Sequence, residues 1–362
     1  MEFFSLKPKI FGLDISDLSL KFLMLKKAKK EFKVSSFGEL SIEPGIIEGG
    51  EVKDEEKLAM VVKEVTEKVK TKYVVASLPE EKAFLQVIKM PVMSEEDLKS
   101  AIIFEAENYI PLPVNEVYLD FEVISPVEGS VKNLEILLAG APKKVVDSYL
   151  RVLKMADLKP VAFEIESLAI ARALINTQVT TQPVLIVDLG ATRSSIIIFD
   201  RKSIRFTTSI PISGMGFTEL LAKNLKISFE DAERLKIEEG LGERLNIKIG
   251  EKTDFKMAKN NIFEILIPAL IDLIQQIEKY IDYYQTHALS SDLPERERKI
   301  QKIIICGGGA NLKGLKEFLE LELKIPVEIG NPLINLGEVK NFPKEKSLSF
   351  TTAIGLASRE YL

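Results

Sequence analysis

Two short segments of the sequence share a pattern that is typical of phosphate-binding turns. Residues 10–25 read IFGLDISDLSLKFLML and residues 184–199 read VLIVDLGATRSSIIIF. In each, an apolar strand ends at an aspartate, Asp14 or Asp188, and a turn of small residues leads into a second apolar strand. Small residues let backbone N–H groups approach phosphate oxygens. The two aspartates are suited to Mg²⁺ that keeps its waters. Either turn alone could also be an ordinary hairpin with a solvent-facing aspartate.

A third segment, IIICGGGANLKGL at residues 303–315, predicts a strand, three glycines and a helix. The strand is expected over Lys302–Cys306 and the helix to begin near Asn311–Leu315. Glycines let the backbone pack against a flat ring, and a helix N-terminus favours phosphate. A tight turn without a ligand is the alternative interpretation. The sequence contains no Gly-Lys-Ser/Thr of a Walker A loop and no Gly-x-Gly-x-x-Gly after its first strand.

A fourth segment, residues 212–236, predicts a glycine turn at Gly214 that leads into a helix. Ser228 then caps a second helix, which carries Glu233 and Lys236 on one face. Such an i,i+3 pair is often only a surface ion pair that contributes a few tenths of a kcal/mol. The pair gains meaning from its position between the second aspartate turn and the three glycines.

The elements that must position these residues follow from apolar spacing and from capping residues. Apolar runs predict strands, and apolar residues at helical spacing after a cap predict helices. The predicted strands are Lys9–Asp14, Leu20–Lys26, Phe32–Ile42, Tyr73–Leu78, Phe84–Met90, Tyr118–Ser125, Leu134–Ala139, Val184–Asp188 and Lys302–Cys306. Helices are predicted after Asp54, after the capping box of Ser94 and Asp97, over Lys143–Ala156, beyond Glu166 and after Ser228.

Composition excludes several classes of protein. The 362 residues are 46% hydrophobic and 28% charged, which is ordinary for a globular chain of two or three domains. The net charge of −5 gives no reason to expect nucleic acid. One cysteine and one histidine, Cys306 and His287, rule out a disulfide framework and a Cys/His zinc site. The sequence shows no signal peptide and no membrane-spanning run, so we expect a cytoplasmic protein that reaches the membrane through a partner.

Taken together and in this order, the four segments resemble the phosphate-1, phosphate-2 and adenosine motifs of the actin/Hsp70/sugar-kinase superfamily. The strand–helix–strand–strand stretch resembles the SHS2 subdomain of the cell-division protein FtsA and of the type IV pilus assembly protein PilM. The wording KMPVMSEEDLKSAIIFEAENYIPLPVNEVYLDF at 89–121 and MADLKPVAFEIESLAIARAL at 155–174 is similar to the PilM family. The ending TTAIGLASREYL also resembles PilM and lacks the amphipathic membrane-targeting helix that follows the FtsA core.

The resemblance implies an α/β, two-lobed actin/Hsp70-like ATPase fold with an inserted SHS2-type subdomain. The expected division assigns residues 1–80 to the first part of subdomain IA, 81–155 to the partner-binding insert, 156–205 to the rest of IA, 206–340 to the second lobe with IIB at about 230–295, and 341–362 to a return into IA.

The resemblance also implies Mg²⁺ and ATP as cofactors and assigns their ligands. The expected nucleotide contacts are Asp14, Ser16, Ser19, Lys21, Asp188, Gly190, Ala191, Thr192, Gly214, Glu233, Lys236, Gly307, Gly308, Gly309 and Ala310, with Asp14 and Asp188 holding Mg²⁺ through water. Ser16, Asp17 and Leu18 depart from the family's phosphate-1 pattern, and Arg193 and Ser194 replace small polar residues of phosphate 2. The carboxylate of Asp17 could weaken binding unless it points away from phosphate or toward Mg²⁺.

Hydrolysis requires a group that orients the attacking water. Glu166, or Glu164, is the candidate, and we expect nucleotide binding with slow turnover at most.

By resemblance, the protein is an ATP-loaded scaffold of the pilus assembly complex that grips the N-terminal cytoplasmic peptide of PilN. The expected walls of the peptide groove are Ala83–Met90 and the helix carrying Ile102, Ile103 and Phe104, although these residues could simply form the core of the insert. The scaffold would link the membrane platform to the motor ATPases, and it could self-associate. Two alternatives remain: an FtsA-like protein that forms filaments with ATP, and a small-molecule kinase.

Overall fold

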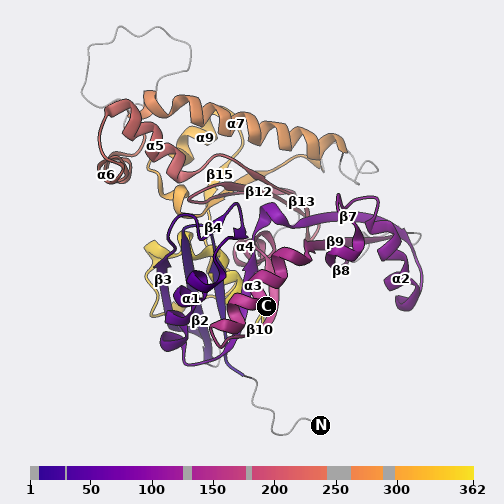
Figure 1. Cartoon of the computed structure of the whole chain (residues 1–362). Coiled ribbons are helices and arrows are strands. Elements are labelled where there is room, and N and C mark those ends of the chain that lie inside the picture. Colours follow the sequence, from indigo (N-terminus) through magenta and orange to yellow (C-terminus); the bar gives the residue numbers. More distant parts are fainter. Residues whose placement is uncertain (1–7, 29–30, 125–132, 177–181, 243–261, 288–297) are drawn as a thin grey trace. The chain divides into compact units, whose positions relative to one another are not determined.

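The computed structural model describes residues 8–28, 31–124, 133–176, 182–242, 262–287 and 298–362. The chain divides into two compact units, which are described separately (Figure 1). The first unit comprises Met1–Thr181, Phe199–Thr208 and Asn331–Leu362, and the second comprises Gln182–Ile198 and Ser209–Gly330. The expected subdomain boundary at residue 205 stays a prediction, and residues Gln182–Ile198 group with the second unit. The reason is that the strand of the second aspartate turn pairs with the strand that precedes the three glycines.

A six-stranded sheet in the order β10-β6-β1-β2-β3-β16 organises the first unit. Its strands are β1 (Ile10–Ile15), β2 (Ser19–Ala28), β3 (Glu31–Ser41), β6 (Tyr73–Leu78), β10 (Lys159–Ile165) and β16 (Val339–Lys340). The first three form an antiparallel meander, while β6 runs parallel to both β1 and β10. A short hairpin of β4 (Ile47–Glu48) and β5 (Glu51–Val52) follows the meander. The central strand β1 is buried on both faces, which explains its continuous apolar sequence.

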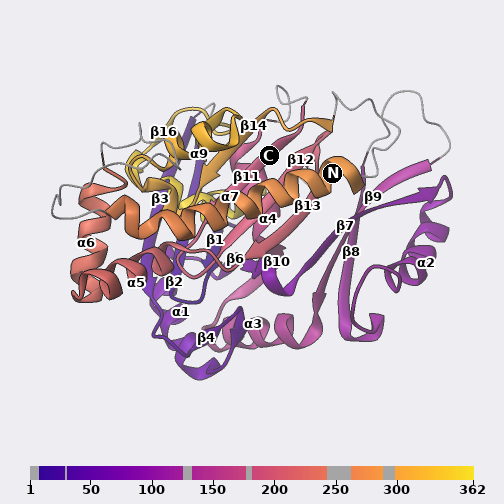
Figure 2. The same cartoon turned by 90° about the horizontal axis from the view of Figure 1, so that it is seen from above.

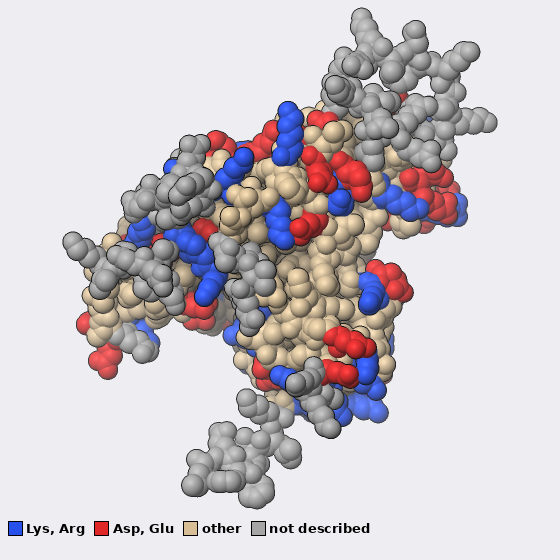
Figure 3. All heavy atoms as spheres, turned by 180° about the vertical axis from the view of Figure 1, so that it is seen from behind, with Lys and Arg blue, Asp and Glu red and all other residues tan. Residues whose placement is uncertain are grey.

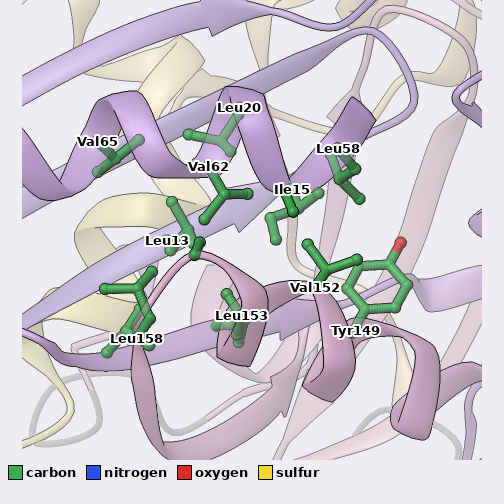
Figure 4. Packing of buried hydrophobic residues seen from close by; sticks show 14 of the residues in the cluster. Leu13, Ile15, Leu20, Leu58, Val62, Val65, Tyr149, Val152, Leu153 and Leu158 are labelled. Carbon is green, nitrogen blue, oxygen red and sulfur yellow. The ribbon is translucent and has the colours of Figure 1, made fainter. Parts of the chain in front are cut away.

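Helices cover both faces of this sheet. On one face α1 (Glu55–Val69) packs against α3 (Lys143–Met155), and Figure 4 shows their apolar side chains meeting those of β1. On the other face α10 (Thr351–Ser358) lies against β1 and α4 (Glu166–Leu174). A Cβ added to Gly12 would lie 2.6 Å from the carbonyl oxygen of Ala353, and one added to Gly355 would lie 1.9 Å from that of Ala169. Only glycine permits this close approach of helix to strand and of helix to helix.

Residues 84–124 and 133–142 form a separate three-stranded sheet with one helix in the order strand, helix, strand, strand, as the sequence predicts (Figure 2). Its elements are β7 (Phe84–Pro91), α2 (Glu95–Ala106), β8 (Val117–Ile124) and the central strand β9 (Asn133–Pro142). The side chain of Ser94 accepts a hydrogen bond from the amide of Asp97 and caps α2. Leu98, Ile102 and Ala106 then bury one face of α2 against the sheet. We call this part the insert.

A second sheet has five strands in the order β13-β12-β11-β14-β15. Its strands are β11 (Val184–Leu189), β12 (Ser194–Asp200), β13 (Ser203–Ile210), β14 (Lys302–Cys306) and β15 (Val327–Ile329). Strands β11, β14 and β15 and most of β12 belong to the second unit, whereas most of β13 is grouped with the first. The helices of the second unit are α5 (Gly214–Leu225), α6 (Phe229–Glu239), α7 (Ile262–His287) and α9 (Leu315–Leu323). The long helix α7 contacts α5 and α9 (Figure 2). It buries Leu266, Leu270, Leu273 and Ile277.

The order β13-β12-β11-β14-β15 repeats the order β3-β2-β1-β6-β10 of the first unit. The duplication that the two aspartate segments predict is thus present in the connectivity of both sheets. Among the described residues, no helix is both long and apolar enough to cross a membrane. On the face shown in Figure 3, acidic and basic side chains are interspersed, as the small net charge leads one to expect.

Candidate functional site

The first aspartate turn lies between β1 and β2 in the first unit. Asp14 is only 6% exposed, and the hydroxyl of Ser77 lies 3.4 Å from its Oδ1. The same hydroxyl accepts a hydrogen bond from the amide of Ile15 at 2.9 Å, and the amide of Ser16 donates to the carbonyl of Ser19 at 2.9 Å to close the turn. Ser77 was not predicted as a site residue. Its only signal is a polar side chain near the end of the apolar strand YVVASL.

The structure brings Asp14, Ser19 and Lys21 together on one face of the sheet. Lys21 lies opposite Asp14 in the β1–β2 ladder and opposite Glu39 in the β2–β3 ladder, and directly opposed residues share a face. The ammonium of Lys21 donates to the hydroxyl of Ser19 at 2.9 Å and pairs with Glu39 at 3.4 Å. These are the three residues of this turn that match the phosphate-1 pattern.

Asp17 points away from the turn and toward the β4–β5 hairpin. Its Oδ2 accepts a hydrogen bond from the amide of Gly49 at 3.2 Å, and its Oδ1 accepts one from the amide of Gly50 at 3.0 Å. The sequence left open whether this carboxylate points away from phosphate or toward Mg²⁺. In the structure it points away from the turn, and two backbone N–H groups of the hairpin bind it.

The two glutamates considered for catalysis have different surroundings. Glu164 is buried and pairs with Arg172 through both carboxylate oxygens, while Arg359 lies 3.5 Å away. Glu166 begins α4, and its Oε2 accepts a hydrogen bond from the amide of Glu80 at 3.2 Å. Burial, together with the nearby carboxylate of Asp14, raises the pKa of Glu166 well above its ordinary value of 4.5. Of the two, Glu166 is the carboxyl group that could exchange a proton beside the turn.

The second aspartate turn is hydrogen-bonded to the start of helix α5 in the second unit. Gly190 is required there, since a Cβ at this position would lie 2.6 Å from the carbonyl oxygen of Arg193. The carbonyls of Gly190 and Ala191 accept hydrogen bonds from the amides of Gly214 and Met215, at 2.9 and 3.0 Å. The predicted glycine turn is in fact the start of α5, because Gly214 is its first residue and Ser213 is its cap. Thr192 completes the same turn.

The glycine loop packs directly on Asp188. Gly307 has φ +80°, and a Cβ there would lie 2.5 Å from Asp188 Oδ1 and 2.6 Å from the carbonyl oxygen of Leu189. The thiol of Cys306 lies 3.4 Å from the same Oδ1. A Cβ on Gly309 would approach Leu189 to 2.9 Å, whereas one on Gly308 would meet nothing within 4 Å. The space over Gly308 suits a flat ring against the backbone, and Ala310 is buried behind it.

Glu233 and Lys236 belong to a partly buried polar cluster and are not a simple surface pair. The ammonium of Lys236 lies 2.7 Å from Glu233, 2.8 Å from the carbonyl of Gly214 and 2.8 Å from the hydroxyl of Thr218. Thr218 is fully buried on α5 and also bonds Glu233. Sequence reasoning missed Thr218, whose signal is its position one helical turn after Gly214.

The predicted nucleotide residues thus form two groups, one in each unit. The first unit holds Asp14, Ser16, Ser19 and Lys21, with Glu166 nearby, and the second holds Asp188, Gly190, Ala191, Thr192, Gly214, Glu233, Lys236 and Gly307–Ala310. Within the described residues, no cluster of three or more His, Cys, Asp or Glu side chains could hold a metal by itself. Any Mg²⁺ would therefore need water or phosphate oxygens as further ligands.

Solved structures of other proteins share the fold of this chain. The structure resembles that of a PilM-PilN type IV pilus biogenesis complex, with a TM-score of 0.78 and 24% identity over 97% of this chain and 98% of that one. It also resembles MreB5 of Spiroplasma citri bound to ADP, with a TM-score of 0.54 and 13% identity over 96% of this chain and 94% of that one. These similarities confirm the predicted actin-like ATPase fold.

Curated sequence relatives include the cell division protein FtsA of Neisseria meningitidis, which is 25% identical over 61% of this chain and 52% of its own length. FtsA of Pseudomonas aeruginosa is 24% identical over 46% of this chain and 40% of its own length. The chain thus spans about half the length of the curated relatives it matches. The family described as type IV pilus assembly protein PilM matches residues 12–361, from the first strand almost to the last residue. The chain belongs to the PilM family of type IV pilus assembly proteins.

Proposed function

We propose that this protein is an ATP-binding scaffold of the type IV pilus assembly complex, which binds the N-terminal cytoplasmic peptide of PilN and links the membrane platform to the motor ATPases. The observation that carries the nucleotide part is the packing of Gly307 on Asp188 and Leu189, together with the hydrogen bonds from the start of α5 to the carbonyls of Gly190 and Ala191. Similarity to MreB5 solved with ADP and with AMPPNP supports it. The peptide part rests on the family and on the similar PilM-PilN complex.

The residues present suit a magnesium nucleotide. The glycine loop leaves open space over Gly308, and Lys21 and the backbone of both turns can face phosphate oxygens. Asp14 and Asp188 would hold Mg²⁺ through water, and the ion would neutralise phosphate charge. Glu233 and Lys236 would contact the ribose and the adenine, with Thr218 holding both in place.

The peptide would bind the insert through apolar anchors. The structure narrows the candidate residues on α2, because Ile102 is buried in the core of the insert whereas Ile103 and Phe104 are 50% and 75% exposed. We therefore retain Ile103, Phe104 and the strand β7 as contacts and assign Ile102 to packing.

Turnover would be slow in this proposal. Glu166 would be the group that orients the attacking water beside the first turn. Burial and the nearby carboxylate of Asp14 raise its pKa, which disfavours the charged form that a general base needs. The nucleotide would then act as a ligand that shifts a conformational equilibrium. Recruitment to the membrane would come through the bound peptide.

The test is calorimetric titration with Mg-ATP and then with a synthetic PilN N-terminal peptide, with a scrambled peptide as control. Saturable binding of both at separate sites is expected. Phe104→Ala should weaken peptide binding and leave ATP binding unchanged, and Ile237→Ala serves as a matched control because Ile237 is an exposed residue of α6.

ATP binding without peptide binding would contradict the scaffold. The similarity to FtsA makes a filament-forming protein the second candidate, and sedimentation of the protein with ATP would then support it.

A further inference from the structure

The hairpin formed by residues 47–52 connects the first aspartate turn to the start of the insert. Asp17, in the turn, accepts hydrogen bonds from the amides of Gly49 and Gly50 at the tip of the hairpin. Gly50 has φ +72°, and a Cβ at this position would lie 2.7 Å from Pro79 Cβ and 2.5 Å from Glu81 Oε1. The tip of the hairpin thus packs against the segment that leads from β6 into β7.

An ion pair fixes the same hairpin to the start of the insert. Glu51 pairs with Lys82 at 3.0 Å and with Lys53 at 2.8 Å. Hydrogen bonds from Lys53 and from Lys82 lower the pKa of Glu51 from 4.5 to about 2, so this carboxylate stays charged at any physiological pH. Lys82 is the last residue of a short 3₁₀ turn, Glu80–Lys82, which precedes β7.

The helix that follows the insert contacts the hairpin as well. Strand β9 leads into α3, and the hydroxyl of Tyr149 on α3 donates to the carbonyl of Gly50 at 3.2 Å. Tyr149 is fully buried, and its ring packs in the apolar cluster that includes Leu13 and Ile15 of β1 (Figure 4). The two chain segments that lead into and out of the insert therefore meet at one glycine, whose amide is held by Asp17.

We propose that Asp17 is a positioning residue that joins the first phosphate turn to both ends of the insert through the 47–52 hairpin, so that a nucleoside triphosphate at the turn and a peptide on the insert affect each other's binding. The ligands follow from the proposed function, on which this coupling rests, but the connection itself is made by residues of one compact unit. Coupling free energies between sites of this kind typically correspond to about 5- to 150-fold changes in affinity.

A simple alternative assigns Asp17 the opposite effect. A carboxylate near a phosphate turn that only repels the nucleotide would weaken binding, and its removal would then raise ATP affinity. In the proposed role its removal releases the hairpin and lowers ATP affinity. Repulsion thus predicts tighter ATP binding when Asp17 is replaced, and the proposed connection predicts weaker ATP binding. Asp17→Ala removes charge and acceptors together, whereas Asp17→Asn removes the charge and keeps one acceptor.

The experiment measures three quantities in the full-length wild type, Asp17→Ala and Asp17→Asn. They are the dissociation constant of Mg-ATP, its ratio with and without saturating PilN N-terminal peptide, and amide hydrogen exchange without ligand. We expect at least about fivefold coupling in the wild type, near the lower end of the usual range. Asp17→Ala should bring the ratio to about one and weaken ATP binding several-fold, and Asp17→Asn should lie between the two.

Hydrogen exchange shows whether Asp17 affects only the hairpin amides that it binds or also the turn that precedes the insert. If Asp17 joins the regions, Asp17→Ala accelerates exchange at Gly49 and Gly50 and also at Lys82 and Ala83, whose amides close the turn before β7. Acceleration confined to Gly49 and Gly50, or tighter ATP binding by both variants, overturns the proposal. A wild type that binds neither ligand contradicts the proposed function, and the exchange at Lys82 and Ala83 then decides by itself whether the connection exists.

Glycine variants provide a second test that leaves the Asp17 carboxylate in place. Gly50→Ala forces the hairpin away from Pro79 and should lower the coupling ratio. Gly45→Ala is the matched control, because Gly45 also has positive φ, at +90°, but its nearest neighbour is 4.0 Å from an added Cβ. Equal loss of coupling in both variants would show that backbone strain alone is responsible and would contradict the proposal.

Discussion

The two sheets have the same strand order, and their aspartates are held in the same way. Asp14 and Asp188 are each the penultimate residue of the central strand, β1 or β11. In each unit the side chain near the end of the neighbouring parallel strand, Ser77 or Cys306, lies 3.4 Å from the aspartate Oδ1. The residues that follow Ser77 and Cys306 along the chain differ in type and in what they contact.

In the second unit the chain continues as Gly307-Gly308-Gly309, which packs on Asp188 and leaves open space over Gly308. In the first unit it continues as Leu78-Pro79-Glu80 and leads into the insert. Glu80 there accepts a hydrogen bond from the amide of Ser167 at 3.2 Å and so occupies the start of α4. The two sheets thus carry two kinds of loop at equivalent positions: the second is bare glycine backbone with open space over Gly308, and the first has side chains that connect the sheet to the insert.

Removal of a turn aspartate is the largest change that this comparison predicts. Asp188→Ala should weaken Mg-ATP binding on the order of a hundredfold, since a lost charge-assisted contact costs up to about 3 kcal/mol and each 1.4 kcal/mol is tenfold. Titration calorimetry measures it, circular dichroism checks that the fold is intact, and Asp120→Ala is the control because that aspartate is exposed on β8. Unchanged ATP affinity in Asp188→Ala would remove this residue from the site.

The glycine loop should tolerate a methyl group at one position and not at its neighbour. Gly307→Ala places a Cβ at φ +80° and ψ 171° against Asp188, in a backbone region that costs other residues about 1–3 kcal/mol. Gly308→Ala meets nothing within 4 Å and should cost well under 1 kcal/mol. Urea denaturation of the two variants gives the difference. Equal destabilisation would contradict the packing of Gly307 on Asp188.

The equivalent donors Ser77 and Cys306 should differ in their contribution to stability. Ser77→Ala leaves the buried amide of Ile15 without its acceptor, which should cost about 1–3 kcal/mol. Cys306→Ala removes only a weak S–H donor and a small buried side chain, so we expect about 1 kcal/mol or less, below the loss in Ser77→Ala. Thermal and urea unfolding measure both. A larger loss in Cys306→Ala would show that the two positions are not used alike.

Loss of the ion pairs of Glu51 with Lys53 and Lys82 should have the smallest effect, and the size of that effect should depend on pH. The folded pKa of Glu51 is about 2, lowered from 4.5, so its stabilisation is present above pH 4.5 and is lost as pH falls toward 2. Glu51→Gln should lower the free energy of unfolding by less than about 1 kcal/mol at pH 7, because the pair is exposed. The difference from wild type should shrink as pH falls toward 2 and vanish below it. A difference that persists there would assign the stabilisation to packing.

Many of the strands, turns and helix caps could be predicted from the sequence because they depend on local patterns. The segments 10–25 and 184–199 predict both hairpins, and the strand Lys302–Cys306 and the caps Asp54, Ser94 and Ser228 are observed where predicted. A capping bond joins residues three apart, and a strand ends where its apolar run ends. The finer subdomain boundaries stay predictions.

The residues that sequence reasoning missed act through contacts between distant segments. Ser77 lies 63 residues from Asp14 in the sequence, and the orientation of Asp17 depends on a hairpin more than 30 residues later. Thr218 is one of several polar residues on α5 until the packing of α6 places Glu233 and Lys236 beside it. Such contacts follow from how the elements pack, which no local pattern specifies.

The most direct test of the proposed nucleotide binding is hydrogen exchange of the wild type with and without Mg-ATP. We expect slower exchange at three places on addition of nucleotide: residues 15–19, residues 190–194 and the glycine loop at 307–311. Protection confined to the insert, or no change at any of the three, would contradict it.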